Sequence, residues 1–147
     1  MNVFLAQGSV AVSAATAKTI GQYAAAAASR AKLKGYRFSA RSGTSTDAPG
    51  QINISTQTTA GTMSAGTLVA RDPGDSAGRG TFQTNATAEP TTTTAIEPLI
   101  DVAPQGAPVI YDYPYGDEPV IAASGRVGLI ATFPQAQTVD FALVIQE

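Results

Sequence analysis

Carboxylates interleaved with tyrosines are the strongest candidates for chemistry in this 147-residue chain. Asp112, Asp117 and Glu118 lie in the segment 109–120, VIYDYPYGDEPV. Paired carboxylates can bind Ca²⁺ or Mg²⁺, or act as acid and base. The same segment also fits a tight turn at residues 114–117 between two strands, with solvated acids and tyrosines packed at a rim. We favour the turn, and assign no catalytic, metal-binding or cofactor-binding residue to the segment.

Two other segments resemble ligand loops only superficially. Residues 72–76 (DPGDS) lack the spacing and the closing Glu of an EF-hand, which favours a plain turn. The glycines of residues 78–80 (GRG) and 125–128 (GRVG) match neither the Walker A motif nor the dinucleotide fingerprint. The sequence therefore predicts no cofactor.

Histidine and cysteine are both absent. A Ser–His or Cys–His nucleophile pair cannot be built without them, and thiolate metal sites and disulfides are excluded. Carboxylate, Lys, Tyr or metal-assisted chemistry would remain open to an enzyme. Because no convergent set of such residues is visible, we expect a protein that is not an enzyme.

Charge is divided unevenly along the chain. Residues 1–71 carry seven basic side chains and one acid, whereas residues 72–147 carry two basic side chains and ten acids. Either basic strands pair with acidic neighbours in a sheet, or opposite faces of the molecule carry opposite sign. The second arrangement would suit head-to-tail contact in a ring, or contact with a charged shell. Nucleic-acid binding by residues 30–41, where Tyr36 and Phe38 alternate with cations, is disfavoured by the overall acidity.

Short β-type runs between Gly, Pro, Asp and Ser predict the elements that must position these residues. The clearest run places Val139, Phe141, Leu143 and Ile145 on one face. A change of face near Gly35 predicts a bulge or twist. The expected strands are 2–7 and 9–14 (hinged at Gly8), 18–22, 30–40, 51–57, 66–71, 81–84, 95–102, 108–113, 118–123, 126–133 and 139–145.

These runs predict an all-β, single-domain antiparallel β-sandwich, jelly-roll-like, over residues 1–147. Residues 1–14 form a candidate N-terminal arm, and residues 71–94 a long polar loop region. Residues 23–30, rich in Ala, could form one or two helical turns or an irregular connection; we favour the connection. No apolar run approaches the roughly 20 residues of a membrane span, so no membrane partner is expected.

Several short motifs resemble a family of small virion structural proteins of tailed bacteriophages. The similar segments are a basic strand at residues 30–36 (RAKLKGY), a Glu-Pro step at 88–91 (AEPT), and C-terminal motifs at 116–121 (GDEPVI), 123–129 (ASGRVGL) and 138–140 (TVD). The chain departs from the family at residues 109–113 (VIYDY), where members usually carry an aromatic–Arg–Trp segment.

The resemblance implies a β-sandwich on the capsid surface of the virion, made in the host cytoplasm, that decorates or cements the capsid. Its implied partners are the major capsid protein and copies of itself, as a homotrimer or homodimer, without nucleic acid or membrane. The arm 1–14 and the loop 71–94 would supply contacts. The alternative is a ligand- or carbohydrate-binding module of a phage tail or fibre, with Tyr111, Tyr113 and Tyr115 stacking on sugar rings.

Overall fold

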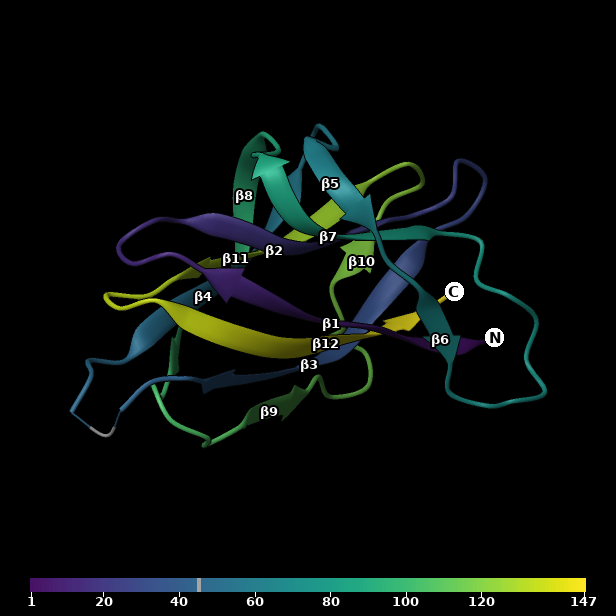
Figure 1. Ribbon diagram of the computed structural model, residues 1–147. Helices are drawn as coiled ribbons and strands as arrows, with labels where there is room; N and C mark the ends of the chain where they lie inside the picture. Colours follow the sequence, from purple (N-terminus) through teal and green to yellow (C-terminus); the bar gives the residue numbers. More distant parts are fainter. Residues whose placement is uncertain (45) are drawn as a thin grey trace.

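The computed structural model describes residues 1–44 and 46–147, and antiparallel β-strands dominate this part of the chain (Figure 1). It contains no helix, which confirms the all-β prediction. The strands are β1 (Val3–Val12), β2 (Lys18–Ala24), β3 (Ala31–Arg41), β4 (Gly50–Gln57), β5 (Thr62–Ala65), β6 (Leu68–Ala70), β7 (Thr81–Ala88), β8 (Thr92–Val102), β9 (Val109–Asp112), β10 (Val120–Ile121), β11 (Arg126–Thr132) and β12 (Gln137–Gln146).

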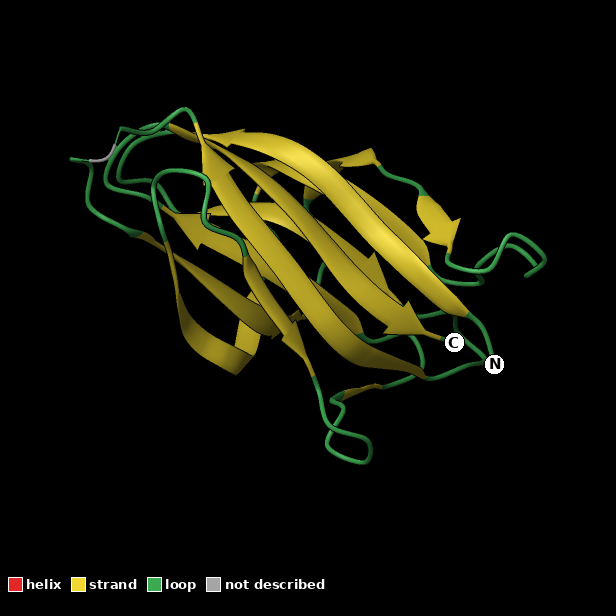
Figure 2. Ribbon diagram, turned by 90° about the horizontal axis from the view of Figure 1, so that it is seen from below, coloured by secondary structure: helices red, strands yellow, loops and turns green. Residues whose placement is uncertain are grey.

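The strands form two six-stranded sheets that pack face to face around one core (Figure 2). Sheet A has the order β10-β3-β12-β1-β6, and β9 also pairs with β3. Both β9 and β10 therefore lie along the same outer edge of β3, on the side away from β12. Sheet B has the order β5-β7-β2-β11-β4-β8. The predicted β-sandwich is confirmed.

The first strand is an interior strand and not an arm, which corrects the expectation for residues 1–14. β1 pairs with β12 along its whole length, from Val3 opposite Gln146 to Val12 opposite Gln137, and residues 4–6 also pair with β6 on the other side. It passes through Gly8 without a break, where two separate strands were expected. Alternate apolar side chains of β1 are buried in the core, so the segment is part of the folded domain.

The loop expected over residues 71–94 is also shorter than predicted. Only the connection between β6 and β7, residues 71–80, lacks strand structure before the short link at 89–91. β7 pairs with β2, where Phe82 lies opposite Tyr23, and Phe82 and Ala86 are buried. The sequence predicted only residues 81–84 of this strand, because polar residues surround Ala86 in its second half. The short strand β5 was not predicted.

A bulge in β3 changes which residues face the core. The register with β12 shifts between Val144 and Ile145, which leaves Lys34 as the extra residue on β3. Leu33 and Tyr36 consequently both face inward, and the predicted change of face near Gly35 is confirmed. Of residues 23–30, the first two end β2, and residues 25–30 form a turn and an irregular connection, which confirms the connection that the sequence favoured over a helix.

Aromatic rings fill the core by lying directly against glycines. A Cβ atom on Gly21 would lie 2.7 Å from Cε2 of Phe141, and one on Gly8 would lie 3.0 Å from its Cζ. The Phe141 ring is thus held between β1 and β2. The other pairs of this kind are Phe133 with Gly50, Phe82 with Gly66 and Tyr23 with Gly80. Close ring–backbone contact lets a chain without Trp close its core.

Candidate functional site: the open edge and the outer face of sheet A

The predicted turn at residues 114–117 is present between β9 and β10. The backbone N–H of Asp117 donates to the carbonyl of Pro114 at 3.1 Å. Gly116 adopts a φ of 98°, which glycine enters at no steric cost. The two acids Asp112 and Asp117 are exposed.

Glu118 is not solvated, contrary to expectation, because two lysines of β3 enclose it. Its side chain is 1% exposed. It accepts a hydrogen bond from the Lys34 ammonium and one from the Gly116 N–H at 2.9 Å, and Lys32 lies 3.5 Å away. The hydrogen bond from Lys34 is the main cause that lowers the pKa of Glu118 to about 2, from an ordinary 4.5. Glu118 is therefore ionised at neutral pH and anchors the turn to β3.

The three tyrosines of the segment do not form one stacking surface. Tyr36 of β3 stacks on Tyr111 with ring centroids 5.4 Å apart. Tyr113 contacts the Tyr36 ring edge-on, with ring centroids 6.1 Å apart. The Tyr113 hydroxyl donates to Glu97 Oε1 of β8 at 2.9 Å, and burial, followed by this hydrogen bond, raises the pKa of Tyr113. Tyr115 alone projects outward, with 94% of its surface exposed.

Aromatic and cationic side chains separate onto opposite faces of β3. Tyr36 and Phe38 belong to the core, with ring centroids 5.1 Å apart, while Arg37 between them lies on the outer face. The two rings are therefore not available for stacking beside the cations on one surface, which is what the disfavoured nucleic-acid interpretation required.

The acidic loop after β6 is a turn. The N–H of Asp75 donates to the carbonyl of Asp72 at 3.0 Å, and the N–H of Gly74 donates to Asp72 Oδ1 at 3.0 Å. Within residues 1–44 and 46–147, no group of three or more His, Cys, Asp or Glu residues could hold a metal ion. The same part of the chain has no helix that is long and apolar enough to cross a membrane.

Several exposed apolar side chains belong to the strands and the turn at one edge of the sandwich, which we call the apolar edge. β9 and β10 form this edge in sheet A, and the Tyr113–Glu97 hydrogen bond joins it to β8, the edge of sheet B. Its members are Leu99 (69% exposed), Ile110 (58%), Tyr111 (42%), Tyr115 (94%) and Val120 (58%). Clustered exposure of this kind is typical of surfaces that contact another protein.

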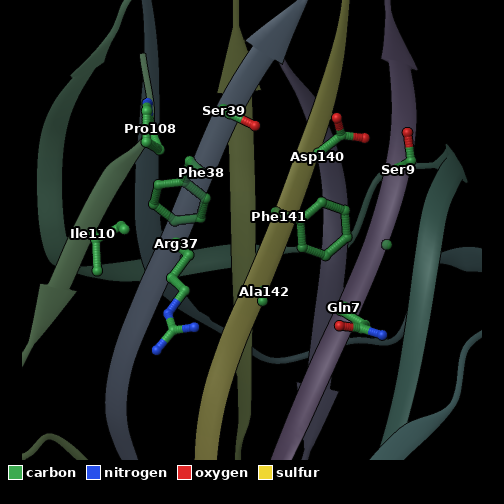
Figure 3. Close-up of a pocket in the computed structure, with 11 residues that line it drawn as sticks. Gln7, Ser9, Arg37, Phe38, Ser39, Pro108, Ile110, Asp140, Phe141 and Ala142 are labelled. Carbon is green, nitrogen blue, oxygen red and sulfur yellow. The ribbon is translucent and has the colours of Figure 1, made fainter. Parts of the chain in front are cut away.

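Next to this edge, the outer face of sheet A holds an open depression of about 580 Å³ (Figure 3). Side chains from four adjacent strands surround it: Pro108 and Ile110 at β9, Arg37 and Ser39 on β3, Asp140 and Ala142 on β12, and Gln7 and Ser9 on β1. Arg41 forms an ion pair with Asp140 at 3.0 Å and donates to Ser9 Oγ at 3.1 Å. The depression thus combines polar groups with an apolar wall.

The ion pairs explain part of the uneven charge along the chain. Each one found in the described residues joins a cation from residues 1–71 to an acid from residues 72–147: Lys32 and Lys34 with Glu118, and Arg41 with Asp140. The first explanation, that basic strands lie beside acidic neighbours, is confirmed for these pairs. Arg37 is the member of β3 that this pattern leaves out.

The sequence interpretation missed Arg37 and the depression around it. Strict alternation put Arg37 on the same face as Ala31 and Leu33. The bulge at Lys34 reverses the alternation, so Leu33 lies in the core while Arg37 lines the outer depression. The predicted change of face near Gly35 was the signal that could have placed it correctly.

No protein-family model, curated protein or solved structure matches this chain.

Proposed function

We propose that this protein is a structural component of a tailed-phage virion that decorates or cements the capsid through protein–protein contacts. The apolar edge is the observation that carries the proposal. A partner that covered large exposed side chains such as Leu99, Ile110 and Tyr115 would remove their apolar surface from water, which lowers the free energy. The resemblance of residues 116–121, 123–129 and 138–140 to virion structural proteins of tailed phages suggests that the assembly is a capsid.

The contact surfaces differ from those that the sequence suggested. β1 pairs with β12 along its whole length and with β6 at residues 4–6, so it is part of sheet A and not an arm that extends toward a neighbour. The apolar edge and the outer face of sheet A take that role instead. The partners would be the major capsid protein and other copies of this chain, as a homotrimer or homodimer, in interfaces with an apolar centre and a polar rim.

The test is to quantify the protein in purified virions by mass spectrometry and to locate it by cryo-electron microscopy. We expect a copy number comparable with that of the major capsid protein, and density on the outer shell. Absence from purified virions would refute the proposal.

Variants then test the surface. Ile110→Asp combined with Val120→Asp should lower capsid occupancy at least about tenfold, because charge replaces apolar contact at the centre of the interface. Val69→Asp is the matched control, since Val69 is also exposed but lies on β6 at the opposite edge of sheet A. If the double variant and the Val69→Asp control bind the capsid with equal occupancy, and neither melting temperature changes, the apolar edge does not contact the capsid.

A carbohydrate-binding module of a tail or fibre is the second candidate. The polar side chains around the depression, Gln7, Ser9 and Asp140, favour it, because sugars are bound by such groups beside an apolar wall. This function predicts only a few copies per virion and reproducible binding on a glycan array that is lost in Gln7→Ala. Shell-like copy number with no array signal would exclude it.

A further inference from the structure

The cations of β3 are matched by ion pairs at both ends of the strand but not in the middle. Lys32 and Lys34 at one end share Glu118, and Arg41 at the other end pairs with Asp140. Arg37 lies between them and has no ion pair or side-chain hydrogen bond with any residue in the described part of the chain.

The surroundings of Arg37 make it unfavourable for its guanidinium to remain without a partner. Its Nε atom is shielded from water without a hydrogen-bond partner. In the sheet register Arg37 lies opposite Ile110 of β9 and Ala142 of β12, so apolar side chains flank it on both sides (Figure 3). A charge with reduced access to water interacts more strongly with an opposite charge than it would in open solvent.

We propose that this depression binds an acidic side chain of a partner protein, with Arg37 as the anchor. The inference rests on the proposed function and deepens it, because it names the chemistry of the segment that the shell presents. Ile110 and Pro108 would contact apolar neighbours of the acid, and Ser9 would donate a hydrogen bond at the rim. A volume of about 580 Å³ is on the scale of small-ligand sites, so it fits a few side chains and not a folded domain.

The nearby acids favour a single carboxylate over a polyanion such as nucleic acid. Asp140 belongs to the lining of the depression, and Asp112 lies on β9 opposite Gly35. Asp140 is neutralised by Arg41. Successive phosphates of a nucleic acid would meet both acids, whereas one carboxylate needs only the guanidinium, which can hold it with two parallel hydrogen bonds.

The binding chemistry can be tested on the isotope-labelled full chain by NMR. The probes are the blocked tripeptide acetyl-Leu-Glu-Leu-amide and its isosteric control acetyl-Leu-Gln-Leu-amide. We expect the Glu peptide to shift the signals of Arg37, Ile110 and Ala142, and the Gln peptide to bind at least about tenfold more weakly. Equal responses to both peptides, shifts confined to other residues, or tighter binding of a single-stranded oligonucleotide at Arg37 would each overturn the proposal.

Two variants isolate the guanidinium. Arg37→Gln should abolish the response to the Glu peptide, while the matched control Arg126→Gln, on sheet B, should leave it unchanged. If Arg37→Gln does not fold, Arg37→Lys replaces it. Lys keeps the charge but not the planar fork, so binding should weaken several-fold.

The same variants on the capsid separate this inference from the proposed function. Arg37→Gln should lower occupancy at least about tenfold relative to Arg126→Gln. If the protein is found in virions and both variants bind equally, the Arg37 site is wrong and the function stands. If the protein is absent from virions, the function fails, and the peptide titration alone decides whether the site exists.

Discussion

Replacing Gly21 with Ala is the sharpest test of how this core closes. The added Cβ would lie 2.7 Å from Cε2 and 3.0 Å from Cζ of the Phe141 ring, whereas ordinary contact begins at about 3.4 Å. The ring must therefore move by roughly 0.7 Å, the difference between 3.4 and 2.7 Å. Its retreat is limited by Gly8 of β1 on the other side and by Phe82 beside it.

We expect Gly21→Ala to lower the free energy of unfolding by about 1–2 kcal/mol. Overpacking of a close-packed core costs about 1–3 kcal/mol. The lower chain entropy of Ala in the unfolded state offsets roughly 0.5–1 kcal/mol of this. For a domain of this size the loss corresponds to a fall in melting temperature of roughly 2–8 °C. Urea and thermal unfolding followed by circular dichroism would measure both quantities.

A second substitution turns this test into a double-mutant cycle. Phe141→Leu removes ring atoms from the space that the Ala methyl group needs, so Gly21→Ala should cost about 1 kcal/mol less in the Phe141→Leu background than in the natural protein. Gly74→Ala is the control, because its nearest neighbour would lie 3.5 Å away; it keeps the entropy effect without the clash and should raise the free energy of unfolding by about 0.4–1 kcal/mol. Strict additivity of Gly21→Ala and Phe141→Leu would refute the packing argument.

Two further predictions concern carboxylates that accept several hydrogen bonds. Because the pKa of Glu118 is about 2 in the folded protein and 4.5 ordinarily, its ion pairs stabilise the fold above pH 4.5, and this contribution disappears as the pH falls toward 2. Glu118→Gln should therefore be less stable at pH 7 and show a flatter fall in urea midpoint between pH 4.5 and 2; parallel pH profiles would contradict this reasoning. Glu147→Gln should cost about 1.5–3 kcal/mol, because the Glu147 carboxylate accepts hydrogen bonds from the Tyr23 hydroxyl at 2.8 Å and from the N–H groups of Arg79 at 2.5 Å and Gly80 at 2.8 Å. Hydrogen exchange at Arg79 and Gly80 should accelerate in this variant, and unchanged protection would count against it.

Local patterns in the sequence were sufficient for several elements. Alternation of Val139, Phe141, Leu143 and Ile145 predicts β12 and its buried face, because side chains on a strand point to alternate sides. Gly116 after Tyr115 marks the turn between β9 and β10, because glycine accepts a positive φ. The absence of His and Cys excludes two common kinds of catalytic site on residue type alone.

The environment of single residues depended on partners far along the chain. Glu118 looks like a surface acid in its own segment, but it is buried because Lys34, 84 residues away, lies on the strand that pairs with β10. Arg37 changes face because of a one-residue bulge against β12. Neither effect is visible in local alternation.

The sequence by itself determined the β class, the turns and the lack of a histidine or thiol site, because these follow from residue type and short spacing. Only the tertiary structure decided that β1 is an interior strand, that Gly8 and Gly21 make room for the Phe141 ring, and where exposed apolar and unpaired cationic groups come together. The physical reason is that strand order, register and ring packing arise from contacts between segments distant in sequence. A strand looks locally the same at the edge of a sheet as it does in the middle.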